Sequence, residues 1–268
     1  AYVSRGLFYA STGKFDQAIA DYDEALKLDP ESTAPLINRA AAHMGQGEFD
    51  KAITDYTDAI LKVGDNQRQV RSLIRQRAIA RKAAGKLDEA IVDFTSILAE
   101  DPDDFSAVMG RGYVYFQKGD SESAIEDFSK AIELKPEDAV AWNNRGFNRY
   151  RAGQHADSLA DYDEALRLAP KYALALQNRA WLLATTEDES IRDGAQAVES
   201  ARTACEITGY ENVGTLASLA AALAAAGQFD EAVGWQEKVV EMANESDLDA
   251  AQKTLTRYQN EEPFSEVD

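Results

Sequence analysis

The sequence has very few of the side chains that bind metals or form disulfides. Its 268 residues include one cysteine, Cys205, and two histidines, His43 and His155. One thiol excludes a disulfide within the chain. One thiol and two histidines far apart in the sequence cannot supply the four ligands of a structural zinc site. We therefore expect no metal. We expect no cofactor either, because Gly110-Arg111-Gly112 lacks the third glycine and the preceding strand of a dinucleotide-binding motif.

Positive charge is also scarce. The chain has 28 lysines and arginines against 47 aspartates and glutamates, which gives a formal net charge of −19. Each contact to a phosphate needs a nearby Lys or Arg, so this balance argues against a broad surface for DNA, RNA or an anionic membrane. It favours a neutral or basic protein or peptide as the partner.

Long apolar runs are missing as well. The longest, 216–226, is alanine-rich and has about eleven residues, short of the roughly 18 that a membrane helix needs. We therefore expect that residues 1–268 do not insert into a membrane. The chain begins at Ala1 without an initiator methionine or a basic, apolar leader, which indicates a processing site or a boundary within a longer protein.

A repeat of about 34 residues runs through most of the sequence. Similar motifs are marked by glycines that lie 34, 38, 34 and 34 residues apart: Gly13, Gly47, Gly85, Gly119 and Gly153. Prolines keep the same spacing, with Gly64 in place of one of them: Pro30, Pro102, Pro136 and Pro170. A period of this length is typical of stacked structural repeats.

Each repeat is predicted to hold two helices joined by a tight turn at the glycine. The second half carries apolar residues at the spacing of one helical face, as in Ala124, Ile125, Phe128, Ala131 and Ile132. The first half carries a shorter stripe and ends at the glycine. Four aspartates that follow the turn are expected to cap the second helix or to stabilise its positive end: Asp16, Asp50, Asp88 and Asp230.

These positions resemble the tetratricopeptide repeat family, whose pattern has a bulky, a small and an aromatic residue in the first helix. Alanine, an aromatic residue, alanine and proline follow in the second. One repeat here reads Val108, Gly112, Tyr115, Ala124, Phe128, Ala131 and Pro136, and the next reads Trp142, Gly146, Ser158, Tyr162, Ala165 and Pro170. The resemblance implies an all-α fold, a right-handed superhelical solenoid of tandem helix-turn-helix repeats.

The resemblance is in register over residues 1–172 and weaker beyond. It implies an array over residues 1–246 with about seven repeats, at 1–32, 33–66, 71–104, 105–138, 139–172, 173–211 and 213–246. The sixth repeat has an insertion near Thr186–Ser190. Residues 247–268 are expected to form a C-terminal capping helix and an acidic tail.

Six arginines occupy one equivalent place in six repeats: Arg5, Arg39, Arg77, Arg111, Arg145 and Arg179. They could form a row of anion-binding groups. However, an aspartate follows each of the first five after sixteen residues: Asp21, Asp55, Asp93, Asp127 and Asp161. In the seventh repeat both places are apolar, as Leu219 and Trp235. We therefore favour ion pairs between packed helices.

No residue pattern points to catalysis. His43 falls where the repeat expects a packing residue, and His155 is expected in a turn. Cys205 is expected on the second helix of the sixth repeat as a small buried side chain. The carboxylates recur with the repeat as solvated faces and provide no pair in unlike environments, which acid–base chemistry requires. We therefore expect that the chain is not an enzyme.

Proteins similar to this one bind extended peptides or partner helices on the concave wall formed by their first helices. In the fourth to sixth repeats the resemblance places these residues on that wall: Met109, Tyr113, Gln117, Asn143, Asn144, Phe147, Arg151, Gln177, Asn178 and Trp181. Phe116 and Tyr150 either face the groove or fill space between repeats. Aromatic rings suit apolar side chains, and amides suit a peptide backbone.

Some members of this family hold the acidic tails of heat-shock chaperones with a set of lysines, arginines and asparagines. Asn38, Asn144 and Asn178 are present here, but the cations are missing, so we do not expect this ligand. The function predicted is a non-catalytic protein–protein interaction module that binds a peptide or partner protein in the concave groove. The alternative is a structural scaffold or spacer that self-associates. A third hypothesis is an enzyme whose chemistry comes from an attached domain.

Overall fold

The computed structural model describes residues 1–264. These residues form fifteen α-helices and no strand. The last four residues of the expected acidic tail, 265–268, lie outside the described residues. The chain divides into two compact units, which meet between Asp127 and Phe128. The fold is an all-α solenoid of tandem helix-turn-helix repeats. Within the described residues, no helix is both long enough and apolar enough to cross a membrane.

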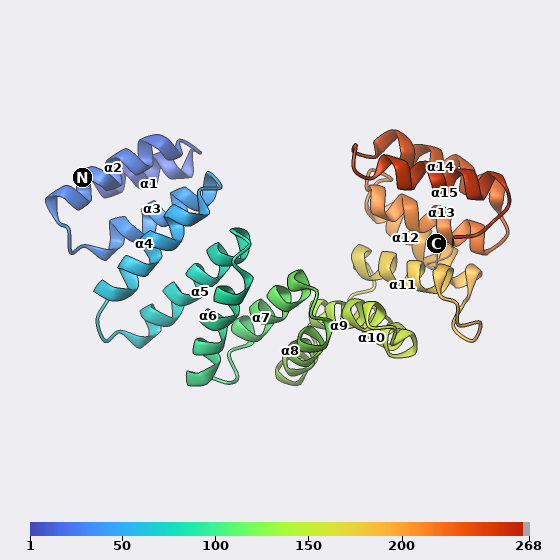
Figure 1. Ribbon diagram of the computed structural model, residues 1–268, viewed down its shortest axis with the longest axis horizontal. Coiled ribbons are helices and arrows are strands. Elements are labelled where there is room, and N and C mark those ends of the chain that lie inside the picture. Colours follow the sequence, from blue (N-terminus) through green and yellow to red (C-terminus); the bar gives the residue numbers. More distant parts are fainter. Residues whose placement is uncertain (265–268) are drawn as a thin grey trace. The chain divides into compact units, whose positions relative to one another are not determined.

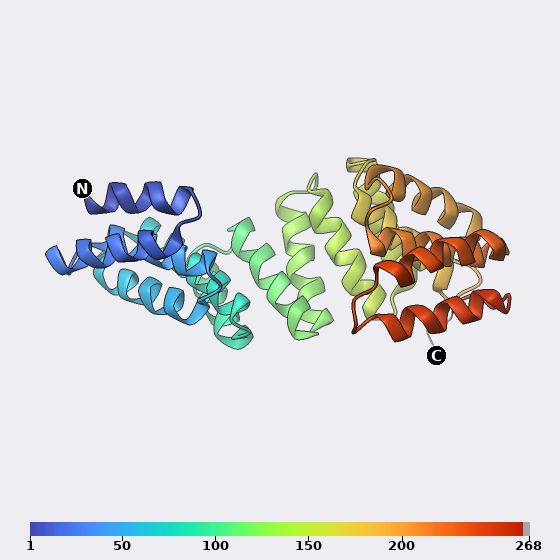
Figure 2. The ribbon, with the colours of Figure 1, turned by 90° about the horizontal axis from the view of Figure 1, so that it is seen from above.

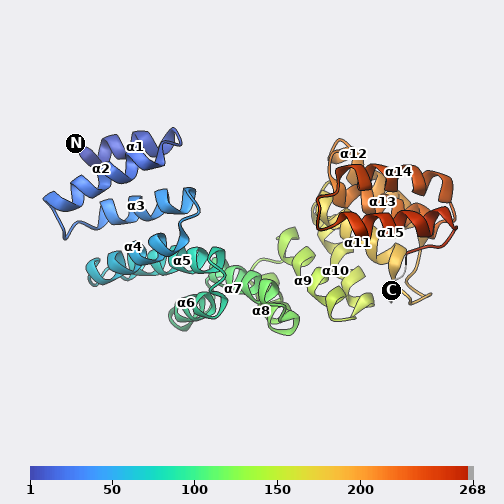
Figure 3. The same ribbon diagram turned by 45° about the horizontal axis from the view of Figure 1, so that its top comes forward.

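The first unit contains the helices from α1 to the first half of α8 (Figures 1 and 3). Their bounds are α1 (Tyr2–Ser11), α2 (Phe15–Leu28), α3 (Thr33–Gly45), α4 (Phe49–Lys62), α5 (Gln67–Ala83), α6 (Leu87–Glu100), α7 (Phe105–Lys118) and α8 (Ser121–Leu134). From α1 to α7, helices that are successive along the chain pack against each other, and α1 also touches α3 and α5 touches α7.

The second unit contains the rest of α8 and the seven helices that follow (Figure 2). Their bounds are α9 (Ala139–Arg151), α10 (His155–Leu168), α11 (Ala173–Thr185), α12 (Gly194–Ile207), α13 (Val213–Ala225), α14 (Phe229–Met242) and α15 (Leu248–Gln259). Helix α15 packs on α14 and buries Tyr258 completely. His155 is the first residue of α10, so its predicted place in a turn is wrong.

Glycine ends the first helix of six repeats, as the sequence predicts. At Gly13 the backbone has φ of +73°, the left-handed conformation that L-residues rarely adopt. No atom lies within 4 Å of the place where a Cβ would be at Gly13, so this glycine is needed for its backbone conformation and not for space. Five other glycines adopt the same conformation: Gly47, Gly85, Gly119, Gly153 and Gly227.

The aspartates after these turns do not cap the second helices. In α2, α4, α6 and α14 the N-cap residue makes no side-chain hydrogen bond, and the aspartate lies in the first turn, where a negative charge is favourable. Three of these aspartates bind the following repeat instead. They accept hydrogen bonds at 2.6 to 2.7 Å in the pairs Asp16–Gln46, Asp50–Lys86 and Asp88–Lys118.

The helices of one repeat lie close because a small residue of the first helix faces a large ring of the second. A Cβ at Gly6 would lie 2.5 Å from the ring of Tyr22, and one at Gly146 would lie 2.9 Å from the ring of Tyr162. Both rings are fully buried. The small and aromatic positions of the repeat pattern therefore form the core of each helix pair, as close-packed interiors require.

The predicted arginine–aspartate pairs are formed. In each, the guanidinium on the first helix donates to the buried aspartate on the second, with Nη2–Oδ1 distances of 2.6 to 2.7 Å: Arg5–Asp21, Arg39–Asp55, Arg77–Asp93, Arg111–Asp127 and Arg145–Asp161. The ion-pair interpretation of these arginines is confirmed.

Four of these arginines, and Arg179 of the sixth repeat, also bind the preceding repeat, a contact that was not predicted from the sequence. From the second repeat to the sixth, each donates at 2.5 to 3.3 Å to a side-chain oxygen on the second helix before it: Arg39–Asp23, Arg77–Thr57, Arg111–Thr95, Arg145–Ser129 and Arg179–Asp163. We call this set of contacts, with the five pairs above, the arginine ladder. It joins helices within repeats and between neighbouring repeats.

Candidate interaction surfaces

In the first unit, a pocket of about 430 Å³ lies between the first helices α5 and α7. Its lining comes from α5 (Arg75, Ile79, Lys82), from α6 (Phe94), and from α7 and its start (Phe105, Ser106, Met109, Gly110, Tyr113). A Cβ at Gly110 would lie 2.5 Å from the ring of Phe94. The glycine therefore lets α7 approach Phe94, which closes one side of the pocket.

The pocket is mainly apolar, with two cationic side chains at its edge. Arg75 forms an ion pair with Asp104, the N-cap residue of α7. The ammonium of Lys82 lies 5.7 Å from the centre of the Tyr113 ring, within the range of a cation–π contact. The pocket therefore suits an apolar side chain beside a polar or weakly charged group.

Two of the three residues predicted for the groove in this unit line the pocket. Met109 is 8% exposed and Tyr113 is half-buried, while Gln117 is exposed and lies outside the lining. The contribution of α5 was not predicted from the sequence. Arg75, Ile79 and Lys82 are spaced by four and three residues and so share one face of that helix, a signal that was available in the sequence.

In the second unit, the first helices α9 and α11 share an aromatic surface. The indole Nε1 of Trp181 donates a hydrogen bond of 2.9 Å to the hydroxyl of Tyr150. The ring of Phe147 lies 6.5 Å from that of Tyr150, and the imidazole of His155 stacks on Tyr150 at 5.5 Å. We call Phe147, Tyr150 and Trp181 the aromatic surface. It includes two residues predicted for the groove and one left open.

The amides beside this surface differ in their exposure. Asn143 is only 1% exposed, and its Oδ1 accepts a hydrogen bond of 3.0 Å from Nδ2 of Asn178. It therefore positions Asn178 and is not available to a ligand, so its predicted place on an open wall is wrong. Asn144 and Asn178 are half-buried, and Arg151 is exposed.

Helix α11 also packs closely on α13. A Cβ at Gly214 of α13 would lie 2.8 Å from Nε2 of Gln177. The side chain of Gln177 therefore packs against the next first helix, and this contact limits its role in binding. The predicted residues of this unit that keep accessible surface on the first helices are Asn144, Phe147, Arg151, Gln177, Asn178 and Trp181.

Phe264, beyond α15, packs against Trp181. The two rings are 5.0 Å apart and inclined by 57°. Arg257 at the end of α15 donates a hydrogen bond of 3.2 Å to the carbonyl of Pro263. The aromatic surface is therefore partly covered by a segment that no repeat pattern could assign.

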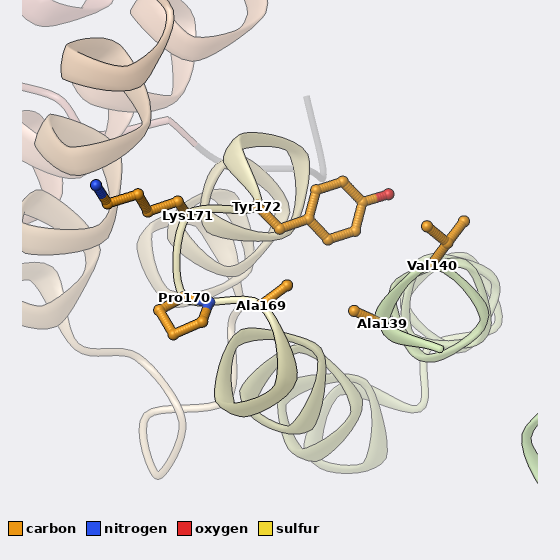
Figure 4. Close-up of a pocket in the computed structure, with 6 residues that line it drawn as sticks. All are labelled: Ala139, Val140, Ala169, Pro170, Lys171 and Tyr172. Atoms are coloured by element: carbon orange, nitrogen blue, oxygen red, sulfur yellow. The ribbon is translucent and has the colours of Figure 1, made fainter. Parts of the chain in front are cut away.

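Another hollow in the second unit, of about 620 Å³, lies between the start of α9 and the loop from α10 to α11. It is lined by Ala139, Val140, Ala169, Pro170, Lys171 and Tyr172 (Figure 4). The figure shows the Tyr172 ring directed across the opening towards Val140. None of these residues was predicted as a contact. The apolar lining suits a side chain of a bound protein.

Two residues considered for catalysis, His43 and Cys205, are buried and bonded to neighbouring groups of the fold. His43 is buried, with Nδ1 at 2.7 Å from Oε2 of Glu48. Cys205 is fully buried on α12, its thiol donates to the carbonyl of Thr215 at 3.3 Å, and burial raises the pKa of the thiol. Residues 1–264 contain no cluster of three or more His, Cys, Asp or Glu side chains that could hold a metal ion.

Four family models match the chain, and each describes the same repeat. The model of a TPR repeat matches residues 112–153. Three models of the tetratricopeptide repeat match residues 1–32, 139–172 and 213–246. These matches lie in both compact units. No curated protein matches the chain.

Solved structures of tetratricopeptide repeat proteins are similar in fold. A protein from Parabacteroides merdae is 18% identical, with a TM-score of 0.70 over 97% of this chain and 98% of that one. The C-terminal part of a protein from Cytophaga hutchinsonii is 16% identical, with a TM-score of 0.70 over 92% and 98%. YrrB, described as a TPR protein with an unusual peptide-binding site, is 19% identical, with a TM-score of 0.54 over 65% of this chain and 88% of that one.

Proposed function

Because the chain belongs to the tetratricopeptide repeat family, we propose that it binds a peptide or partner protein on the first helices of its repeats. This repeat is generally a non-catalytic interaction fold, and the chain is a protein–protein interaction module. We propose that the array covers residues 1–246 and that α15 caps its end.

The aromatic surface carries the proposal. Tyr150 and Trp181 come from the first helices of two neighbouring repeats and are joined by a hydrogen bond of 2.9 Å. Asn144, Phe147 and Tyr150 follow one another at a spacing of three residues on α9, and Asn144 and Phe147 are half-buried. Rings and amides so combined can bury an apolar side chain and pair with a peptide backbone.

The pocket between α5 and α7 supports the same kind of function in the first unit. Its volume of about 430 Å³ is enough for a large apolar side chain. The net charge of −19 favours a neutral or basic partner, because like charges slow the encounter and oppose binding. YrrB, a TPR protein described as having an unusual peptide-binding site, offers a precedent for peptide binding by an array of this fold.

Affinity capture followed by titration of the purified partner tests the proposal. We expect the double variant Asn144→Ala, Phe147→Ala to weaken binding by about 30-fold, since loss of a central aromatic contact typically costs about 2 kcal/mol. The melting temperature should stay nearly unchanged. Arg167→Ala, at an exposed site near the end of the second helix α10, is the control and should bind as the parent does. Loss of folding without a separable binding defect would contradict the proposal.

Self-association is the second candidate, and exposed apolar residues on α1 favour it. Phe8 is 61% exposed and Leu7 is 49% exposed. A contiguous apolar patch at the edge of a repeat array can pair with another copy. Sedimentation would then show a mass that rises with concentration and that falls when Phe8 is changed to Ser. The double variant Asn144→Ala, Phe147→Ala should show the same dependence of mass on concentration as the parent chain.

A further inference from the structure

The segment after α15 leaves the helix through a strained turn. Glu261 has φ of +58°, a left-handed conformation that glycine adopts more readily. The N–H of Glu261 donates to the carbonyl of Tyr258 at 3.1 Å, and the N–H of Glu262 donates to that of Arg257 at 2.9 Å. These two bonds close the helix end and redirect the chain. The turn directs the following residues towards α11.

The redirected segment is held by two contacts. Arg257 donates to the carbonyl of Pro263 at 3.2 Å. The ring of Phe264 then lies 5.0 Å from the ring of Trp181, at an inclination of 57°, which is a favourable geometry for an aromatic pair. The indole of Trp181 is itself oriented by its hydrogen bond to Tyr150. A positioned ring on α11 therefore receives the ring of Phe264.

The segment binds in the manner of a short peptide. Glu261, Glu262 and Pro263 are exposed, and the half-buried Phe264 makes the ring contact. The segment is not helical and belongs to no repeat. One aromatic anchor with solvated flanks is the usual pattern of peptide recognition, in which few side chains supply most of the affinity.

We infer that Trp181, oriented by Tyr150, is a receptor for a proline–aromatic segment, and that Pro263–Phe264 occupies it within the chain. The inference rests on the proposed function, because it concerns the same aromatic surface. A partner that inserts an aromatic residue here must displace Phe264. The segment thus acts as an internal competitor that weakens binding of the partner.

Charge indicates which partner displaces the segment best. The internal competitor carries Glu261 and Glu262 beside its proline, in a chain of net charge −19. The net negative charge of the chain disfavours an acidic segment in general, while tethering favours it by holding the segment at an effective concentration in the millimolar range. A peptide with the same Pro–Phe pair and basic flanks avoids this disadvantage. The receptor therefore favours a proline–aromatic peptide with neutral or basic neighbours.

Fluorescence anisotropy with the full chain tests the inference. The probe is a labelled peptide with the sequence of residues 259–268 and lysine in place of both glutamates at 261 and 262. For a peptide affinity of about 100 μM, an effective concentration of about 1 mM lowers the apparent affinity about tenfold. We expect Phe264→Ala to bind this peptide about tenfold more tightly than the parent chain. A peptide with alanine for its phenylalanine should not bind.

Matched variants separate this inference from folding and from the proposed function. Met242→Ala changes an exposed apolar residue elsewhere in the second unit and should bind as the parent does. Trp181→Leu keeps an apolar side chain and should lose the peptide even in combination with Phe264→Ala. Equal affinity of the parent and Phe264→Ala, or no binding to either, would overturn the inference. If Asn144→Ala, Phe147→Ala still lost a captured partner in that case, the proposed function would stand without it.

Discussion

Arg145 and Asp161 form a two-pronged ion pair across one helical hairpin. Nη2 of Arg145 lies 2.7 Å from Oδ1 of Asp161, and Nε lies 3.0 Å from Oδ2. Asp161 also accepts a bond of 2.8 Å from Arg149, and its side chain is 2% exposed. The hydrogen bonds of this buried carboxylate are therefore made with two guanidinium groups and not with water. Such a geometry makes each partner dependent on the other.

Arg145→Ala should destabilise the fold strongly. It removes one of the two cations that hold a buried carboxylate, and such losses typically cost about 3–5 kcal/mol. The midpoint of urea unfolding, followed by circular dichroism, should fall. The double variant Arg145→Met, Asp161→Leu removes both charges of this pair. Arg149 then loses its bond to Asp161, but its side chain is 21% exposed and can be hydrated, so the variant should recover part of the loss. Arg167→Ala, which breaks an exposed pair with Glu164, should leave the midpoint unchanged. An equal fall for both arginines would argue against the ladder.

Substitution by alanine at two glycines within helices should change the stability of the chain in opposite directions. Gly110→Ala places a Cβ where the buried ring of Phe94 lies 2.5 Å away, so we expect a loss of about 1–3 kcal/mol through overpacking. At Gly234, in α14, no atom lies within 4 Å of that place. Gly234→Ala should therefore stabilise the chain by about 0.5–1 kcal/mol, because alanine favours the helix. Thermal unfolding of the two variants checks the difference in sign.

Alkaline pH should weaken the fold through its buried tyrosines. Burial raises the pKa of Tyr162 above its ordinary value, and the same holds for Tyr258. The folded state then keeps the phenol protonated while the unfolded state loses the proton near pH 10. The stability supplied by these groups is complete below about pH 10 and is lost as the pH rises further. Urea midpoints at pH 8 and pH 10.5 should show the fall, and Tyr162→Phe should reduce it. If the urea midpoint of Tyr162→Phe fell as much as that of the parent chain, groups other than Tyr162 would cause the loss of stability.

The fold was predictable because the pattern repeats. One glycine at a turn is a weak signal, but six in register predict one hairpin per repeat, and the left-handed backbone at Gly13 gives the physical reason. The pairing of Arg145 with Asp161 was predictable for a similar reason: in the seventh repeat both positions are apolar together. A property that recurs at a fixed spacing can be read from a single sequence.

The candidate site was less predictable, because binding residues vary where the repeat does not constrain them. The register placed Asn143 and Asn144 together on the wall, but one helical step separates them by about 100°, and only Asn143 is buried. Phe264 lies outside every repeat, so no periodicity connects it with Trp181. From the second repeat to the sixth, the second partner of the ladder arginine is a polar residue that recurs on the preceding helix, as in Asp163 before Arg179. Its chemistry varies among aspartate, threonine and serine, so the contact is hard to predict from the sequence.

The arginine ladder restricts how such a chain can change its length. Arg39, Arg111 and their equivalents each bind an oxygen in their own hairpin and another in the hairpin before. Deletion or duplication of one whole period returns every guanidinium to an equivalent pair of oxygens. A deletion or insertion of another length would separate a guanidinium from its buried carboxylate and leave both without their partner. Growth and shrinkage by complete modules are therefore the changes that this architecture tolerates best.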